Sequence, residues 1–250
     1  MRAKKESIGY KLRFLLIVYT IGLWITMIFF FQRLTGRIKI VHPERFPKHW
    51  QNPYLFKNGL IVASNHPSLI DPFLVSCLFG DQYIINPFKF APYNIPEVKN
   101  YNKWYWKWAE QIMIWVERGN KQSMRAAFRK SVNVVNSGKI LIIHPEGGRT
   151  SSASEKDLFY SPKKGKKLRH LKEGVGSLIK RTKASVLFVW IDDSDKVMPN
   201  LPGRFYSFPR LWNKVVIKIG EVVRFDSDLS REELTQQVVT NLLKLADEGE

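Results

Sequence analysis

Short apolar runs alternate with stretches of helical character from about residue 59 onward. A run of four to eight apolar residues bounded by Gly, Pro or polar residues is typical of a buried strand. The segments that fit this description are Gly59–Ser64, Gln82–Asn86, Gln111–Val116, Lys139–His144, Ser185–Ile191 and Lys214–Gly220. Helices are predicted at Lys121–Ser137, at Glu173–Arg181, and after the capping box of Ser230 and Glu233. This order predicts a single α/β domain with a central mixed sheet flanked by helices.

The most apolar part of the chain lies near the N-terminus. Phe14–Phe31 contains no charged residue, and as a helix it would be about 27 Å long, close to the thickness of the hydrocarbon core of a bilayer. It is too long for the apolar region of a cleaved signal peptide, and no small-residue cleavage site follows it. We therefore expect residues 1–50 to form an N-terminal membrane anchor, with a helix at about 14–31 and a linker, and residues 51–250 to form the globular domain.

The topology of the anchor stays open from the sequence. Both flanks are basic, so the positive-inside rule gives little preference. Gly22 would allow a bend, which makes a re-entrant helix pair in one leaflet an alternative to a single span. A second cluster, Tyr101–Trp108, mixes Trp and Tyr with Lys, as suits the headgroup layer. Its Trp104 and Trp108 would equally suit one face of a core helix.

The charge balance narrows the possible partners. Forty Lys and Arg residues against 22 Asp and Glu give a formal charge of +18 and a pI near 9.9. Such an excess favours nucleic acid, an anionic membrane or phosphorylated ligands. Nucleic-acid binding does not explain the apolar N-terminal run. We therefore expect anionic membrane lipids, and not nucleic acid, as the binding partner. The single cysteine, Cys77, excludes a disulfide within the chain and a Cys-rich metal site, and its apolar setting predicts buried packing.

One short segment carries candidate chemistry. Asn65-His66-Pro67-Ser68-Leu69-Ile70-Asp71 follows the first predicted strand. Pro67 disfavours helical geometry at His66, and Ser68 with Asp71 resembles a capping box that starts a helix through Leu78. A loop histidine and a carboxylate in the first helical turn can then face one another. In such a pair the imidazole accepts a hydroxyl proton while the carboxylate holds its other N–H, although Asp71 in a cap alone is the simpler structural interpretation.

The segment NHPSLIDP resembles the His-x4-Asp signature of the glycerolipid acyltransferases, a family that includes the lysophosphatidic acid acyltransferases. Three further segments follow in the order of that family. They are Ile114–Gly119 (IWVERG), Ile143–Ser151 (IHPEGGRTS), and Leu171–Val175 (LKEGV) with the strand after it. Together they cover about residues 59 to 191.

The resemblance implies roles for particular residues. His66 would be the general base, and Asp71 would orient it. Arg118, Glu146 and Gly147 match positions that help to bind the glycerol-phosphate acceptor, and Arg149 keeps its place in the third segment. The guanidinium of Arg118 can form a bidentate hydrogen bond to a phosphate. Glu146 would bind an acceptor hydroxyl or hold a basic residue in place.

The resemblance also implies the reaction. The acceptor hydroxyl would attack an acyl thioester, either acyl-CoA or acyl carrier protein, with backbone N–H groups after Pro67 as candidate oxyanion donors and without a metal or redox cofactor. The expected acceptor is a lysophospholipid, foremost 1-acylglycerol 3-phosphate. Glycerol 3-phosphate or a lyso-aminolipid is the alternative, and a non-catalytic membrane scaffold is the alternative from another class. The catalytic domain is expected to face the cytoplasm, where the thioesters are.

Two details qualify the match. His144 stands where the family usually has Phe, which leaves the identity of the acceptor open. A group of basic residues in the loop at 162–169 suits binding to an anionic membrane. The alternatives are that these residues bind the phosphates of coenzyme A or that they form a solvent-exposed loop. The basic residues are Lys163, Lys164, Lys166, Lys167 and Arg169.

Overall fold

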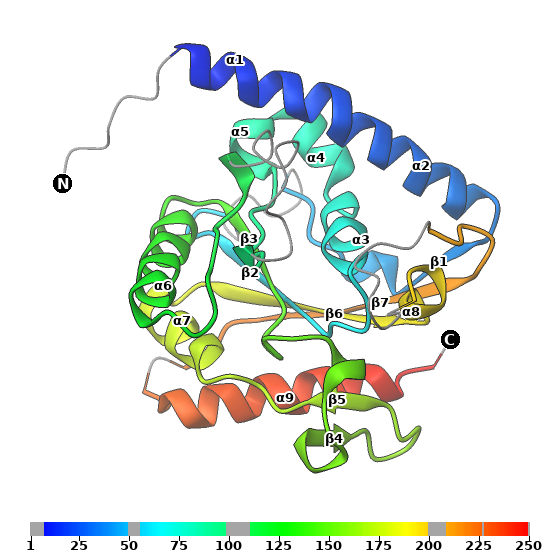
Figure 1. The fold of residues 1–250 in the computed structure, drawn as a ribbon, viewed down its shortest axis with the longest axis vertical. Helices are drawn as coiled ribbons and strands as arrows, with labels where there is room; N and C mark the ends of the chain where they lie inside the picture. The colour runs from blue at the N-terminus through cyan, green and yellow to red at the C-terminus, as the bar shows by residue number, and fades with distance from the viewer. Residues whose placement is uncertain (1–7, 50–55, 99–110, 200–208, 227, 250) are drawn as a thin grey trace.

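A five-stranded mixed sheet lies at the centre of the computed structural model, which describes residues 8–49, 56–98, 111–199, 209–226 and 228–249 (Figure 1). The strand order is β1-β7-β6-β2-β3, and only β6 and β7 are antiparallel. The strands are β1 (Ile38–Val41), β2 (Leu60–Ser64), β3 (Ile140–Ile143), β6 (Ser185–Asp192) and β7 (Val215–Val223). The predicted fold class is confirmed.

The central strands are apolar at successive positions because both faces of the sheet are covered. In β2, Leu60 and Val62 belong to the core cluster on one face, while Ile61 and Ala63 belong to the cluster on the other. One face carries α3 (Asp71–Cys77), α4 (Gly80–Ile85) and α5 (Pro87–Phe90). The opposite face carries α7 (Gly174–Thr182) and α9 (Arg231–Asp247), with α6 (Lys121–Asn136) beside α7 (Figure 1).

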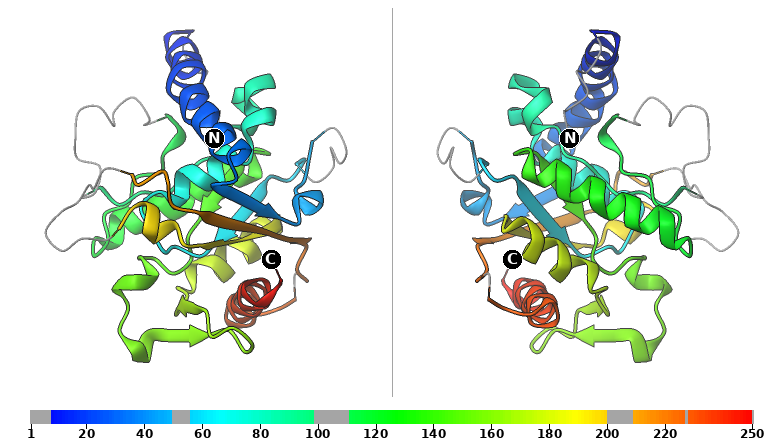
Figure 2. Two further views of the ribbon diagram at one scale, coloured as in Figure 1. Left: turned by 90° about the vertical axis from the view of Figure 1, so that its right-hand side faces the viewer. Right: turned by 90° about the vertical axis from the view of Figure 1, so that its left-hand side faces the viewer.

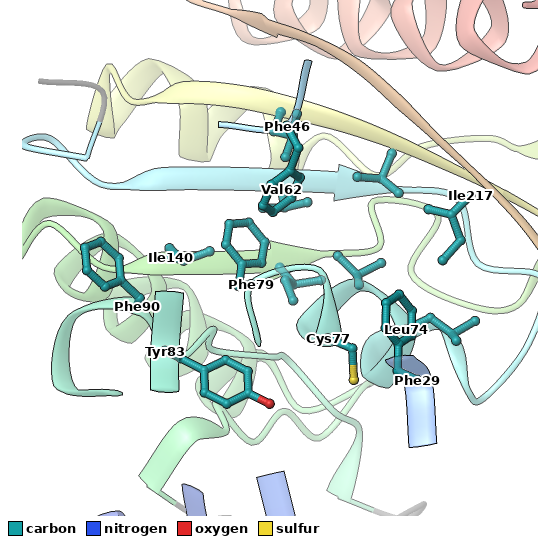
Figure 3. Packing of buried hydrophobic residues seen from close by; sticks show 14 of the residues in the cluster. Phe29, Phe46, Val62, Leu74, Cys77, Phe79, Tyr83, Phe90, Ile140 and Ile217 are labelled. Carbon is teal, nitrogen blue, oxygen red and sulfur yellow. The ribbon is translucent and has the colours of Figure 1, made fainter. Parts of the chain in front are cut away.

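The N-terminal helix runs across the outer side of α3, α4 and α5. It comprises α1 (Ile8–Ile17), a π-helical turn η1 (Val18–Gly22) and α2 (Leu23–Leu34), and it continues as one helix rather than a re-entrant pair (Figures 1 and 2). The π turn lies at Gly22, where the carbonyl oxygen accepts a hydrogen bond from Tyr83 at 3.0 Å. Phe29 packs near Leu74 and Cys77 of α3 (Figure 3). The burial of Cys77 confirms its predicted place in the core.

The outward side of this helix is apolar and exposed. Leu12, Leu16, Trp24, Met27 and Phe31 are each more than half exposed. The 27-residue helix has a hydropathy of 2.4 over its most apolar window and is long enough to cross a membrane by length and composition. One such helix near the N-terminus is weak evidence for a span. The expected boundary at residue 50 stays a prediction, although β1 lies before it and pairs with β7.

The structure corrects two predicted strands. Gln82–Asn86 falls largely in helix α4, where Gln82 is buried and its amide donates to the Pro47 carbonyl oxygen. Gln111–Val116 makes only isolated bridges, from Met113 and Val116, to the segment at 94–97. Short apolar runs do not distinguish strand from helix, and here the tertiary contacts decide. The aromatic cluster Tyr101–Trp108 lies outside the described residues.

Two small elements complete the domain at the end opposite the N-terminal helix. Strands β4 (Leu158–Tyr160) and β5 (Lys167–Arg169) form an antiparallel hairpin whose turn carries the basic loop. The views in Figures 1 and 2 agree that the hairpin and the N-terminal helix lie at opposite ends of the molecule. The hairpin turn is fixed to α9, because the N–H groups of Lys163 and Lys164 donate to Asp247. The hairpin turn therefore lies away from the surface that the apolar helix presents.

Candidate active site

The candidate residues meet where the parallel strands β2, β3 and β6 end at the same edge of the sheet. Asn65, directly after β2, locks this edge together. The side-chain Nδ2 of Asn65 donates to the Ile191 carbonyl oxygen at 2.8 Å, and the side-chain Oδ1 accepts from the backbone N–H of Ile191 at 2.7 Å. The residue that follows, His66, is thereby held at a fixed position over the strand ends.

His66 and Asp71 form the expected pair. Nδ1 of His66 lies 3.0 Å from Oδ2 of Asp71, which is fully buried and also accepts from the N–H of Ser68 at 2.7 Å. The other carboxylate oxygen accepts from the Ser194 hydroxyl at 2.5 Å. Because the carboxylate accepts, Nδ1 carries the hydrogen, and Nε2 of His66 is left with a free lone pair.

The expected capping box is only half present. Asp71 accepts from Ser68 N–H, but the Ser68 hydroxyl donates to the Met198 carbonyl oxygen at 3.0 Å and does not cap the helix. Helix α3 begins at Asp71 itself. One oxygen of Asp71 therefore holds both the histidine and the backbone before the helix. The Ser68 N–H is occupied by this contact and does not serve as an oxyanion donor in this arrangement.

The surroundings favour an uncharged imidazole. Burial, with a smaller contribution from the charges of Arg118 and Arg149, lowers the pKa of His66 to about 3. Burial also raises the pKa of Asp71 to about 7, against the hydrogen bonds from Ser194 and Ser68. Since these two groups share a hydrogen bond, their protons are lost as properties of the pair. The form of the pair that could act as a general base is a neutral imidazole beside a carboxylate.

Glu146 organises the loop after β3. Its carboxylate is buried and accepts three hydrogen bonds: from the backbone N–H of His66 at 2.6 Å, from the Thr150 hydroxyl at 2.7 Å and from the backbone N–H of Arg169 at 3.0 Å. Burial raises its pKa to about 7, while these bonds oppose the rise. The carboxylate thus fixes the backbone at His66 and Arg169, and the role expected for Glu146 toward the acceptor stays a prediction. Gly147 follows with φ +64°, a conformation that side chains disfavour, and Lys172 packs over it.

A group of positive side chains surrounds this glycine turn. Arg169 and Arg118 are the neighbours that a side chain at Gly148 would meet, with Arg169 close enough to overlap. Arg118 is about two-fifths exposed, and its guanidinium lies 3.4 Å from the Glu97 carboxylate. Together with Arg149, whose charge acts on His66, these groups gather positive charge beside the histidine.

An apolar cavity of about 810 Å³ opens at the same place. His66 and Arg118 line one part of it. The remaining walls are largely apolar and come from the N-terminal helix, α3 and the segment at 91–97, including Val18, Ile21, Ile25, Leu69 and Phe73. The N-terminal helix is thus one wall of a cavity that begins at the candidate base.

The six predicted site residues all lie at this edge of the molecule, but sequence reasoning missed some of their partners. Ser194 follows β6, and Thr150 begins the short turn η5 (Thr150–Ser152). Arg169 had been noted only as part of the basic loop. The signal that was available for Ser194 is its position, three residues after a strand predicted to end at this edge.

The model of the acyltransferase family matches residues 37–192, well over half of the chain and all six predicted site residues. The chain belongs to the acyltransferase family. The match covers strands β1, β2, β3 and β6 together with the loops after β2 and β3, whereas β7 and Ser194 lie beyond it.

Two individual acyltransferases are similar to the chain. A probable 1-acyl-sn-glycerol-3-phosphate acyltransferase from Mycoplasma pneumoniae is 26% identical over 117 residues, 46% of this chain and 39% of that protein. The match thus spans well under half of the length of that relative. The crystal structure of the 1-acyl-sn-glycerophosphate (LPA) acyltransferase PlsC from Thermotoga maritima superposes with a TM-score of 0.54 at 20% identity, covering 96% of this chain and 95% of that one. This second likeness supports the fold.

Proposed function

We propose that the protein transfers a fatty acyl group from acyl-CoA or acyl carrier protein to the hydroxyl of a lysophospholipid, foremost 1-acylglycerol 3-phosphate. The observation that carries the proposal is the meeting of three features at one point. A neutral histidine held by a carboxylate stands between a group of arginines suited to phosphate and an apolar cavity suited to an acyl chain. The cavity lies within the size range of small-molecule sites, about 300–1,000 Å³.

In the proposed reaction the free Nε2 of His66 accepts the proton of the acceptor hydroxyl as its oxygen attacks the thioester carbonyl carbon. Asp71 holds the opposite N–H and stabilises the imidazolium that forms. The tetrahedral intermediate collapses, the carbon–sulfur bond breaks, and the imidazolium returns its proton to the leaving thiolate. The products are an ester and a free thiol, so no oxidant or reductant is needed.

The arginines bind the acceptor in this proposal. Arg118 is exposed enough to reach a ligand, and Arg149 lies near enough to influence His66. A phosphate held by these side chains would place the glycerol hydroxyl next to the histidine. The acyl chain of the donor would then extend into the apolar cavity under the N-terminal helix.

Membrane association is part of the proposal. The helix at 8–34 is packed along the domain on one side, where Tyr19 donates to the Ile84 carbonyl oxygen at 2.8 Å, and presents apolar side chains on the other. This packing favours a helix that lies along the membrane surface with its outer side immersed, rather than a free-standing span. The β4–β5 hairpin lies at the opposite end of the molecule from this helix, so we assign its lysines to a soluble acidic donor rather than to the membrane.

The activity is tested with purified protein in detergent, incubated with acyl-CoA and acyl carrier protein donors and a panel of lysolipids. His66→Ala should abolish transfer, whereas His170→Ala, at an exposed histidine directly after β5, should not change it. Folded protein that transfers to no acceptor would favour the scaffold alternative. Full activity in His66→Ala would overturn the assignment of the base.

The topology is tested with one tag at the N-terminus and another at the C-terminus, in vesicles of known orientation. A helix that lies on one surface leaves both tags accessible on the cytoplasmic side. A single span places the two tags on opposite sides, and that result would refute the surface arrangement.

A further inference from the structure

A second histidine, His144, lies directly against the candidate base. The two imidazole rings are stacked, with centroids 4.3 Å apart and an angle of 17° between the planes. His144 follows β3, and both histidines line the same cavity. The mechanism proposed above gives His144 no task.

The contacts of His144 fix its tautomer. Its Nδ1 lies 3.1 Å from the Asn65 carbonyl oxygen and 3.3 Å from the Ser64 carbonyl oxygen. Both of these partners are acceptors, so Nδ1 carries the hydrogen and Nε2 presents a lone pair. Burial lowers the pKa of His144 to about 3, so the ring stays neutral at ordinary pH and keeps this acceptor.

The lone pair on Nε2 of His144 has no hydrogen-bond donor in the described part of the chain. Nε2 of His144 is buried and makes no hydrogen bond there. A buried polar atom without a partner is costly and is rare in folded proteins, so a ligand that supplies a donor at this point would be favoured. His144 lies beside the candidate base and in the wall of the cavity, where a bound substrate would supply such a donor.

We propose that Nε2 of His144 accepts a hydrogen bond from a second hydroxyl group of the substrates, distinct from the hydroxyl that is acylated. The attacking hydroxyl has a single proton, and His66 takes it, so this hydroxyl cannot also donate to His144. 1-Acylglycerol 3-phosphate has one hydroxyl. The second one therefore comes from a polyol phosphate acceptor or from a hydroxylated acyl chain near its carbonyl carbon. This inference rests on the proposed function and narrows its substrates.

Two matched substrate pairs distinguish these sources. The first compares a 3-hydroxyacyl-CoA with the plain acyl-CoA of the same length, with one acceptor for both. The second compares glycerol 3-phosphate with its 1-deoxy analogue, with one plain donor for both. In each pair the readout is the ratio of kcat/KM values, which does not depend on how much of a preparation is active.

Three variants separate the acceptor atom from the ring. His144→Phe keeps a stacked ring but removes both nitrogens. His144→Asn can still donate to the Asn65 carbonyl oxygen but places no acceptor at the position of Nε2. His144→Gln extends an amide to about that position and should recover part of the effect.

The wild type should favour the hydroxylated member of one pair by about tenfold. That preference should disappear in His144→Phe and His144→Asn and return in part in His144→Gln. The inference would be overturned if the wild type used both members of each pair with equal kcat/KM, or if a preference persisted in His144→Phe. Either result would leave the proposed function intact. Failure of the wild type to transfer any acyl group would instead refute the proposed function, and this inference with it.

Discussion

The hydrogen bond from Ser194 to Asp71 offers a direct test of how the catalytic pair is tuned. The Ser194 hydroxyl lies 2.5 Å from Oδ1 of a fully buried carboxylate. A hydrogen bond to a charged group contributes about 1.5–3 kcal/mol, and about 1.4 kcal/mol corresponds to one pKa unit. Because this bond stabilises the ionised form, Ser194→Ala should raise the pKa of the pair by about one to two units.

The sign of the effect on activity follows from the tautomer. A protonated Asp71 would donate to Nδ1 of His66, which would place the imidazole hydrogen on Nε2 and remove the base. Activity should therefore rise with pH as the pair loses this proton, with an apparent pKa near 7 in the wild type. In Ser194→Ala this rise in activity should occur at higher pH, so that activity near pH 7 falls about 5- to 50-fold and recovers in part under alkaline conditions.

The assay is the pH dependence of kcat/KM in detergent from about pH 5.5 to about pH 9.5. Ser131→Ala is the matched control, because Ser131 is also buried and donates to a backbone carbonyl oxygen, but within helix α6. In Ser131→Ala, kcat/KM should rise over the same pH range as in the wild type. A rise in Ser194→Ala that stays in place or moves to lower pH would refute the tuning of Asp71 by Ser194.

Three further changes test other parts of the structure. Asp71→Asn should lower kcat/KM by about 10²–10⁴-fold at every pH, as measured with the best acceptor. Gly176→Ala should lower the free energy of unfolding by about 1–3 kcal/mol in thermal or denaturant unfolding, because a Cβ there would overlap the Arg231 carbonyl oxygen. Gly174→Ala, in the same helix but with no atom within 4 Å of the added carbon, should be nearly neutral. Ile25→Trp should narrow the cavity and shift the preference among acyl-CoA donors toward shorter chains, and an unchanged preference would argue against the cavity as the acyl site.

The parts of the fold that were predictable are those that local pattern determines. β2, β3 and β6 are continuous apolar runs because they are buried on both faces. The capping box of Ser230 and Glu233 marks the start of α9, and both of its hydrogen bonds are present. Strand β1 was missed because it lies at the edge of the sheet, where exposed Lys39 interrupts its apolar run and its partner β7 is far along the chain. No local pattern reports such a partner.

The candidate site shows the same division. His66 and Asp71 are five residues apart, so a short motif contains both halves of the pair. Ser194 joins them from more than 120 residues away, and the contact depends on β6 lying next to β2 in the sheet. The role of Glu146 was likewise hidden, because its partners come from two other loops. A sequence pattern identifies chemical groups that stand close together in the chain, whereas their supporting contacts follow from the strand order.

The position of the N-terminal helix connects acyl binding with membrane association. Val18 and Ile25 line the cavity, while Trp24 and Met27 of the same helix are exposed. One helix therefore separates the proposed acyl site from the proposed membrane surface. An acyl chain that leaves the cavity would enter the bilayer after passing only this helix, so the product would not need to cross water. On this reasoning the helix is a component of the active site and not only an anchor, since without it the cavity would lose one wall.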